Sequence, residues 1–301
     1  MTRIIEKVRS ALDKHSPCFS FEYYPPKDRG NWPVFFQKVE RMSLLLPQFI
    51  DVTWGTGSPT SLASLEVARD IQAHTGIDTM MHLTCTHRSK AQLMDILREV
   101  HDRTGLRNLM ALRGNRPKEG VWQPHPEGFV CAAELVRAIR DAYGDAFCIS
   151  VAGYPEGHHE FGAPSPDFAG SPEYFRQIGH LREKVEAGAD FIVTQLCYDL
   201  DQICRFRDDC EANGIHCPIV PGILPVHSAQ TWEKIAAFSA TIPKPLAEDY
   251  ARVAPQDDVA FDAFAVRLLS GQIEFLHAHG FWAVHLYTLN HEKLISRVLK
   301  G

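Results

Sequence analysis

Short apolar runs rich in β-branched and aromatic residues recur along the chain and predict eight β-strands. They are CFSFEYY (18–24), FIDVTW (49–54), TMMHLTC (79–85), NLMALR (108–113), FCISVAG (147–153), DFIVTQL (190–196), CPIVPGI (217–223) and WAVHLYT (282–288). Between them, apolar residues return at three- and four-residue steps, which predicts amphipathic helices. Several of these segments end at a glycine, as expected of a helix C-cap: Gly76, Gly105, Gly144, Gly188 and Gly214.

The alternation of strands with helices favours parallel strands joined by right-handed crossovers. Eight such units in 301 residues fit an α/β fold of the closed (β/α)8 type, a TIM barrel. A doubly wound open sheet would normally carry a glycine-rich phosphate turn, but the chain has no GxGxxG and no GxxxxGK[ST] motif. The long interval between the seventh and eighth strands, residues 224–281, predicts two or three extra helices.

Composition and charge narrow the class of function. A net charge of −6 without a basic stripe disfavours a nucleic-acid partner. The eight cysteines form no CxxC pair and lie mostly within apolar runs, as expected of reduced thiols in a cytoplasmic protein. No apolar run is long enough to cross a bilayer, and the N-terminal segment lacks the apolar core of a signal peptide. The oligomeric state stays open, with a homo-oligomer among the options.

Polar side chains gather where the predicted strands end, at the face of a TIM barrel that carries catalytic groups. In chain order these residues are Glu22, Thr53, His82, Arg113 with Asn115, Tyr154, Gln195, Gly222 and Tyr287. Two long loops rich in Gly and Pro, 114–128 and 154–172, follow strands at the same face and could cover a large ligand. This concentration of polar groups on one rim predicts an active site.

Structural explanations compete with this reading of the strand ends. Glu22 could form a buried ion pair with Arg113, and His82 could be a hydrogen-bonded core histidine. Tyr154 and Tyr287 could be packing aromatics with a solvated hydroxyl group.

Two histidine-rich clusters raise the alternative of a metal-dependent hydrolase on a TIM barrel. They are HLTCTH (82–87) and EGHHE (156–160). In the first, His82 and Cys85 would point to opposite faces of a strand. The second lacks a fixed helical spacing such as HExxH. Both patterns disfavour a metal site, and no metal is expected.

The strand-end segments, taken together in order, resemble the methylenetetrahydrofolate reductase family. They read FSFEYYPPK, DVTWG, HLTCT, ALRGN, VAGYPEGH, KVEAGADFIVTQLCYD, PIVPGILPV and HLYTLN, and the likeness runs from about residue 19 to 292. VAGYPEGH and ADFIVTQL are nearer the eukaryotic-type catalytic domain. The resemblance implies a single catalytic domain over 1–301, without the C-terminal regulatory domain of the eukaryotic enzymes.

The resemblance also implies an activity and a cofactor. FAD would be bound without a Rossmann motif, in agreement with the missing glycine fingerprint. NADH or NADPH would reduce the flavin and leave. 5,10-methylenetetrahydrofolate would then take its place and be reduced to 5-methyltetrahydrofolate, which is ping-pong behaviour. NADH is favoured only because no evident pair of Arg residues could bind a ribose phosphate.

Glu22 matches the acidic residue of the family that acts as general acid toward the folate nitrogen. Its place among aromatic residues of FSFEYY predicts partial desolvation, which favours the protonated carboxyl group. The resemblance implies FAD binding by Thr53, His82, Arg113, Gly114, Asn115, Tyr154, His158 and Lys184. It implies substrate binding by Glu22, Gln195, Tyr287 and His291.

Three positions depart from the pattern of the family. Asn115 stands at a catalytic position where the family has an Asp near the flavin ring, which predicts a higher flavin potential. Gln177 stands where an Asp commonly contacts the ribityl chain, and His291 stands where Arg is usual. These departures keep open a third reading, a catalytically weakened homologue that binds FAD or folate without turnover.

Overall fold

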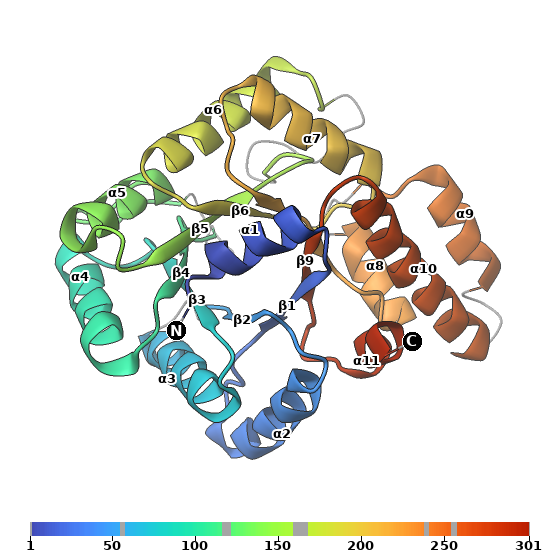
Figure 1. Cartoon of the computed structure of the whole chain (residues 1–301), viewed down its shortest axis with the longest axis horizontal. Helices are drawn as coiled ribbons and strands as arrows, with labels where there is room; N and C mark the ends of the chain where they lie inside the picture. The colour runs from blue at the N-terminus through green and yellow to red at the C-terminus, as the bar shows by residue number, and fades with distance from the viewer. Residues whose placement is uncertain are drawn as a thin grey trace.

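The computed structural model describes residues 2–54, 58–115, 122–158, 168–237, 241–253 and 258–300. Within these ranges, parallel strands form one curved sheet that is surrounded by helices (Figure 1). The strands are β1 (Cys18–Tyr23), β2 (Phe49–Val52), β3 (Thr79–Thr84), β4 (Asn108–Leu112), β5 (Cys148–Gly153), β6 (Phe191–Thr194), β7 (Ile219–Val220), β8 (Gly222–Ile223) and β9 (Ala283–Tyr287). Their spatial order is β7-β6-β5-β4-β3-β2-β1-β9-β8.

The barrel closes through the short strands β7 and β8, which together occupy the predicted seventh run. They are separated by Pro221, which has no N–H group to donate to a neighbouring strand. β7 pairs with β6, whereas β8 pairs with β9. The carbonyl group of Pro221 itself accepts a hydrogen bond of 2.9 Å from the backbone N–H of His285. The predicted (β/α)8 barrel is therefore confirmed, with its seventh strand split in two.

Helices surround the barrel, except for α1 (Ile4–Lys14), which lies across one of its openings (Figure 1). The others are α2 (Trp32–Ser43), α3 (Ser58–Thr75), α4 (Lys90–Glu99), α5 (Ala132–Tyr143), α6 (Pro172–Glu186), α7 (Leu200–Ala212), α8 (Ala229–Ala237), α9 (Lys244–Val253), α10 (Asp258–Ala278) and α11 (Lys293–Lys300). α8, α9 and α10 lie between the seventh and eighth predicted strands, which confirms the extra helices expected there. None of the described helices has the length and apolar character needed to cross a membrane.

Local sequence signals explain several helix ends. Ser89 and Gln92 form a capping box at the start of α4, and Ser171 caps α6 through the backbone N–H of Tyr174. The five glycines predicted as C-caps all have positive φ angles, a conformation in which other residues are strained. The helix boundaries therefore follow from hydrogen bonding that the sequence encodes locally.

Strand alternation divides the barrel into an apolar outer layer and an inner layer. The inner layer is apolar near the amino-terminal end of the barrel and polar at the carboxyl end. Ile50 and Val52 of β2 point outward to the helices, whereas Phe49 packs inside with Met80 and Phe191. Helix α1 crosses one opening of the barrel (Figure 1), and its buried side chains join this inner apolar cluster. The amino-terminal end of the barrel is thus sealed by apolar packing, which leaves the carboxyl end for a ligand.

Candidate active site

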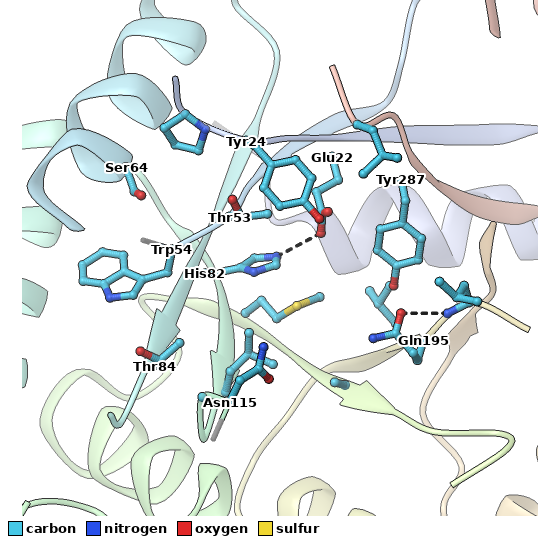
Figure 2. Close-up of a pocket in the computed structure, with 18 of the residues that line it drawn as sticks. Glu22, Tyr24, Thr53, Trp54, Ser64, His82, Thr84, Asn115, Gln195 and Tyr287 are labelled. Atoms are coloured by element: carbon cyan, nitrogen blue, oxygen red, sulfur yellow. Dashed lines mark hydrogen bonds and ion pairs between the residues drawn. The ribbon is translucent and has the colours of Figure 1, made fainter. Parts of the chain in front are cut away.

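A cavity of about 920 Å³ lies at the carboxyl ends of the strands (Figure 2). Its volume is near the upper end of the roughly 300–1,000 Å³ usual for ligand pockets. The predicted site residues that line it are Glu22, Thr53, His82, Arg113, Gly114, Asn115, Tyr154, His158, Gln195 and Tyr287. Glu22 and Gln195 therefore share one cavity, although they come from β1 and from the end of β6.

Two of the predicted residues do not line this cavity. Lys184 lies behind Tyr154, with its Nζ 5.6 Å from the ring centroid, and donates a 3.0 Å hydrogen bond to the carbonyl oxygen of Ala152. Burial lowers the pKa of Lys184 to about 8. His291 packs against His227, with the ring centroids 4.8 Å apart. Their roles in binding FAD and substrate remain predictions.

Gln177 also lies outside the cavity lining. Its side-chain carbonyl accepts a 2.9 Å hydrogen bond from the backbone N–H of His158. Because His158 lines the cavity, Gln177 supports the loop that carries this histidine. Because the family commonly has Asp at this position, the sequence predicted a weaker contact of Gln177 with the ribityl chain. The structure shows that Gln177 also holds the backbone of His158.

Glu22 is 4% exposed and points into the barrel from β1. Its Oε2 lies 3.6 Å from Nε2 of His82 and 4.0 Å from Nε2 of His285, so the ion pair suggested with Arg113 is replaced by contacts with histidines. Figure 2 shows the ring of His82 directed toward the Glu22 carboxyl group, with Tyr24 beside it.

The aromatic surroundings expected for Glu22 are only partly correct. Phe21 and Tyr23 belong to the outer apolar layer, where Tyr23 packs edge-on against Phe35 at 5.8 Å. They alternate away from Glu22 because successive residues of a strand face opposite sides. Tyr24 and Tyr287 share the cavity lining with Glu22, and the carboxyl group itself contacts His82 and His285.

Asp51 is a functional candidate that the sequence analysis missed. Its side chain is fully buried, and its Oδ2 accepts a 2.7 Å hydrogen bond from Nε2 of His82. Burial alone would lower the pKa of His82, but the charge and hydrogen bond of Asp51 raise it. The signal was an acidic residue in the middle of the apolar run FIDVT, at an inward position of β2.

His285 completes this group of polar side chains below the cavity. Its Nδ1 is 2.7 Å from Oγ of Ser20, and its Nε2 is 3.8 Å from Oδ2 of Asp51. The ring stacks at 14° on Phe49 of the inner apolar cluster. The register of the parallel strands explains the cluster, because Ser20 pairs with His285 and Glu22 with Asp51.

The same side chains bear on the metal alternative. In the part of the chain that the structure describes, Glu22, Asp51 and His82 are the one group of three potential ligands within 4.8 Å of one another. The 2.7 Å contact between His82 and Asp51 is a hydrogen bond. Tetrahedral zinc ligands at about 2.0–2.1 Å from the ion would lie roughly 3.3 Å apart. The spacing therefore suits a proton between these two groups.

The first cluster named from the sequence, HLTCTH, contributes only His82 to this group within the described residues. Cys85 is fully buried, with its Sγ 3.3 Å from the carbonyl oxygen of Leu112 rather than near His82. His159 and Glu160 of the second cluster lie outside the described residues.

The opposite side of the cavity is formed by the turn after β4. Gly114 has a φ of 97°, and a Cβ added there would meet Oγ1 of Thr86 at 1.9 Å. This close packing presents Arg113 and Asn115, on either side of Gly114, to the cavity. The guanidinium group of Arg113 lies 4.8 Å from the ring centroid of Trp122.

Tyr287 and Gln195 form the wall nearest the split strand. The hydroxyl group of Tyr287 donates a 2.6 Å hydrogen bond to the carbonyl oxygen of Thr194. Burial, with the negative charge of Asp51, raises the pKa of Tyr287 well above its ordinary value. The side-chain oxygen of Gln195 accepts a hydrogen bond from the backbone N–H of Leu196 (Figure 2). Both side chains are therefore fixed beside the cavity.

Residues 7–301 match the family model described as methylenetetrahydrofolate reductase. The chain belongs to the methylenetetrahydrofolate reductase family. It is 38% identical over 301 residues to methylenetetrahydrofolate reductase (NADH) 1 of Arabidopsis thaliana, covering 99% of this chain and 50% of the relative. It is 32% identical to the probable methylenetetrahydrofolate reductase (NADPH) of Caenorhabditis elegans, covering 98% of this chain and 44% of the relative. The chain thus spans about half the length of the curated relatives it matches.

Solved structures support the barrel fold. One is an uncharacterized protein from Clostridium thermocellum that binds two copies of 5-methyl-5,6,7,8-tetrahydrofolic acid. It aligns with a TM-score of 0.65 at 13% identity, over 97% of this chain and 96% of the other. Dihydropteroate synthase from Xanthomonas albilineans aligns with a TM-score of 0.52 at 12% identity, over 96% and 92% of the two chains. At these identities the likeness concerns the fold of this methylenetetrahydrofolate reductase family member.

Proposed function

We propose that this protein reduces 5,10-methylenetetrahydrofolate to 5-methyltetrahydrofolate with NADH or NADPH, by way of bound FAD. Family membership supports this reaction. The observation that carries the proposal is the position of Glu22, a buried carboxyl group at the edge of a cavity of about 920 Å³. A general acid needs to reach the bound substrate and to be shielded from bulk water, and the burial of Glu22 in the cavity lining supports this role.

The residues around the cavity fit FAD. The turn at Gly114 leaves no space for a side chain of its own and brings Arg113 and Asn115 to the lining. Hydroxyl, imidazole and guanidinium groups suit the phosphates, ribityl chain and ring edge of a flavin dinucleotide. Thr53, His82, Arg113, Asn115, Tyr154 and His158 would hold the cofactor, and Lys184 would support Tyr154 from behind. When bound, FAD supplies the hydride chemistry, and the protein supplies orientation and electrostatics.

A single cavity also supports the proposed ping-pong order. Glu22, Gln195 and Tyr287 line the same space as the residues assigned to FAD. The nicotinamide and the folate would therefore occupy this region in turn. Gln195 and Tyr287 would orient the folate, and Glu22 would transfer its proton to the folate nitrogen that leaves carbon when the five-membered ring opens.

The relatives favour NADH as the first reductant to test. Plant relatives named for NADH are 37–39% identical to this chain, whereas the relative named for NADPH is 32% identical. The preference between the two nucleotides is part of the proposal and is measured by the rate at which each one bleaches the flavin.

Glu22→Gln tests the role of the general acid. The substitution keeps the size and hydrogen-bonding shape of the side chain but removes its acidic proton. We expect flavin reduction by NADH to continue, while reoxidation by methylenetetrahydrofolate slows by about 100-fold or more. Glu134→Gln, on α5 outside the cavity lining, is the matched control. Equal loss of both half-reactions in Glu22→Gln would assign Glu22 a structural role instead.

A further inference from the structure

Asp51 and Glu22 compete for one N–H group of His82. Nε2 of His82 is 2.7 Å from Oδ2 of Asp51 but 3.6 Å from Oε2 of Glu22. The shorter contact has hydrogen-bond geometry and the longer one does not. A single N–H donates one strong hydrogen bond, so Asp51 occupies the donor that Glu22 would otherwise use. We propose that Asp51 is a positioning residue that keeps the acidic proton on Glu22 by holding His82 away from it.

The hydrogen bond of the His82 N–H group to Asp51 affects Glu22 because an N–H donor stabilises a carboxylate more than a carboxylic acid. Without Asp51, Glu22 would be the nearest acidic partner of His82 and would form the ion pair itself. Asp51 therefore prevents the general acid from becoming the partner of a cation. Within the described residues, no Lys or Arg forms an ion pair with Glu22 either.

The charge of Asp51 acts in the same direction as its hydrogen bond. Oxygen atoms of Asp51 and Glu22 lie within 4.8 Å of each other in the buried group. Two carboxylates at this separation in a buried site disfavour double ionisation, so the pair retains a proton that isolated carboxylates would lose. Asp51 remains the ionised member because it accepts the short bond from His82, and the proton is left on Glu22.

The other groups that face Glu22 leave this assignment in place. His285 and Tyr287 approach from β9, and Nε2 of His285 stays 4.0 Å away. Burial raises the pKa of Tyr24, whose phenol lies beside Glu22 in the cavity lining. Nδ1 of His285 is occupied by Ser20. Asp51 and His82 are therefore the charged pair that acts most directly on Glu22.

The proton on Glu22 has a use that rests on the proposed function. The O–H bond of Glu22 breaks and an N–H bond forms on the folate nitrogen. The ring C–N bond opens at the same nitrogen, which keeps the bonding electron pair. The carboxylate of Glu22 then regains a proton from solvent before the next turnover. Each turnover therefore consumes one proton, in addition to the hydride that reaches carbon.

Infrared titration of the purified holoprotein tests the inference without any turnover. A protonated carboxyl group has a carbonyl stretch separate from that of a carboxylate, and Glu22→Gln identifies the band of Glu22. We expect this band in the wild-type protein at pH 7. In Asp51→Asn its midpoint should move to lower pH by about one unit, the lower end of the effect of a nearby charge. Asp78→Asn is the control, because Asp78 is buried and paired with Lys7 at the sealed end of the barrel.

A kinetic titration provides the second arm of the test. The rate at which methylenetetrahydrofolate reoxidises the reduced flavin should fall as the pH rises, and this fall should occur about one pH unit lower in Asp51→Asn than in wild type. Above both midpoints, Asp51→Asn should therefore be about tenfold slower than wild type. Asp78→Asn should follow the wild-type profile.

Two results would overturn the inference. One is the same infrared midpoint in Asp51→Asn and wild type. The other needs no variant at position 51: a wild-type protein that shows no protonated carboxyl band of Glu22 at pH 7. If the wild-type flavin is not reoxidised by the folate, the proposed function fails, while the infrared titration still decides the role of Asp51.

Discussion

Asn115 lies at the carboxyl end of β4, where its neutral amide lines the cavity. An Asp at this position would add a negative charge near the proposed flavin and would oppose the charge that the flavin gains on reduction. We expect Asn115→Asp to lower the flavin midpoint potential, as measured by redox titration of the holoprotein. Asn213→Asp, at the end of α7, adds the same charge away from the cavity and should leave the potential unchanged. An unchanged potential in Asn115→Asp would refute the electrostatic role.

At the scale of single residues, the sequence predicted the rim of the cavity better than the layer below it. Ends of barrel strands meet at one face whatever the packing details, so Glu22 and Gln195 could be placed together in advance. Asp51 and His285 were missed because their importance depends on the register between strands, which the sequence alone does not display. The alternation of side chains along β1 explains why Phe21 and Tyr23 do not surround Glu22.

The turn after β4 depends on Gly114. Alanine there would need an unfavourable φ of 97° and would place its Cβ 1.9 Å from Oγ1 of Thr86. We expect Gly114→Ala to lower the free energy of unfolding by about 2–4 kcal/mol, from backbone strain and overpacking together. Urea denaturation measures this change, and flavin affinity should fall with it.

Gly76→Ala is the control for this turn. Gly76 has a φ of 69°, but no atom lies within 4 Å of an added Cβ. Its cost should be limited to backbone strain, about 1 kcal/mol. Equal costs in the two variants would show that the contact with Thr86 does not constrain the turn.

Helix α1 acts as a plug for the amino-terminal opening of the barrel. Ile5 is 2% exposed and packs in the inner apolar cluster, whereas Arg9 on the same helix is exposed. We expect Ile5→Ala to lower the free energy of unfolding by about 2–4 kcal/mol because it leaves a cavity in this cluster. Arg9→Ala should change it by less than about 0.5 kcal/mol. Equal urea midpoints for Ile5→Ala and Arg9→Ala would contradict the claim that α1 stabilises the barrel by sealing its amino-terminal opening.

At the scale of elements, the predicted strands and most helix ends agree with the structure because apolar periodicity and glycine C-caps are local signals. The split of the seventh strand at Pro221 was not predicted. The packing of α1 across the barrel was not predicted either, since an amphipathic pattern shows that a helix buries one face but not which surface covers it.

The stability of the whole molecule should depend on pH through His227. Burial, with the nearby His291, lowers the pKa of His227 to about 4, compared with roughly 6.5 in an unfolded chain. As the pH falls below 6.5 the unfolded state binds this proton first, so stability is lost between about pH 6.5 and 4.

His227→Phe keeps a ring at this position and removes the titration. Between pH 7 and pH 5 the wild-type protein should lose about 1 kcal/mol more of its free energy of unfolding than the variant, after allowance for partial exposure. Urea denaturation at the two pH values measures this difference. His216→Phe, at an exposed position, should retain the wild-type dependence. Parallel pH profiles for wild type and His227→Phe would exclude His227 as the cause.

The molecule as a whole has one sealed end and one open end. Apolar packing with α1 closes the barrel below, and polar side chains from seven strands or their following loops meet in one cavity above. The polar group around Glu22 lies between these two regions. This arrangement gives two different substrates access to the same space and to the same acidic group, which is the central claim of the proposed function.

Two-step stopped-flow spectroscopy of the FAD-loaded protein tests that claim most directly. The absorbance of the oxidised flavin should disappear on mixing with NADH in the absence of folate. It should return on mixing the reduced protein with methylenetetrahydrofolate in the absence of oxygen and nicotinamide. Reduction by NADH without reoxidation by the folate would indicate a flavin-binding homologue that lacks the reductase activity, and a protein that binds no flavin would contradict the account altogether.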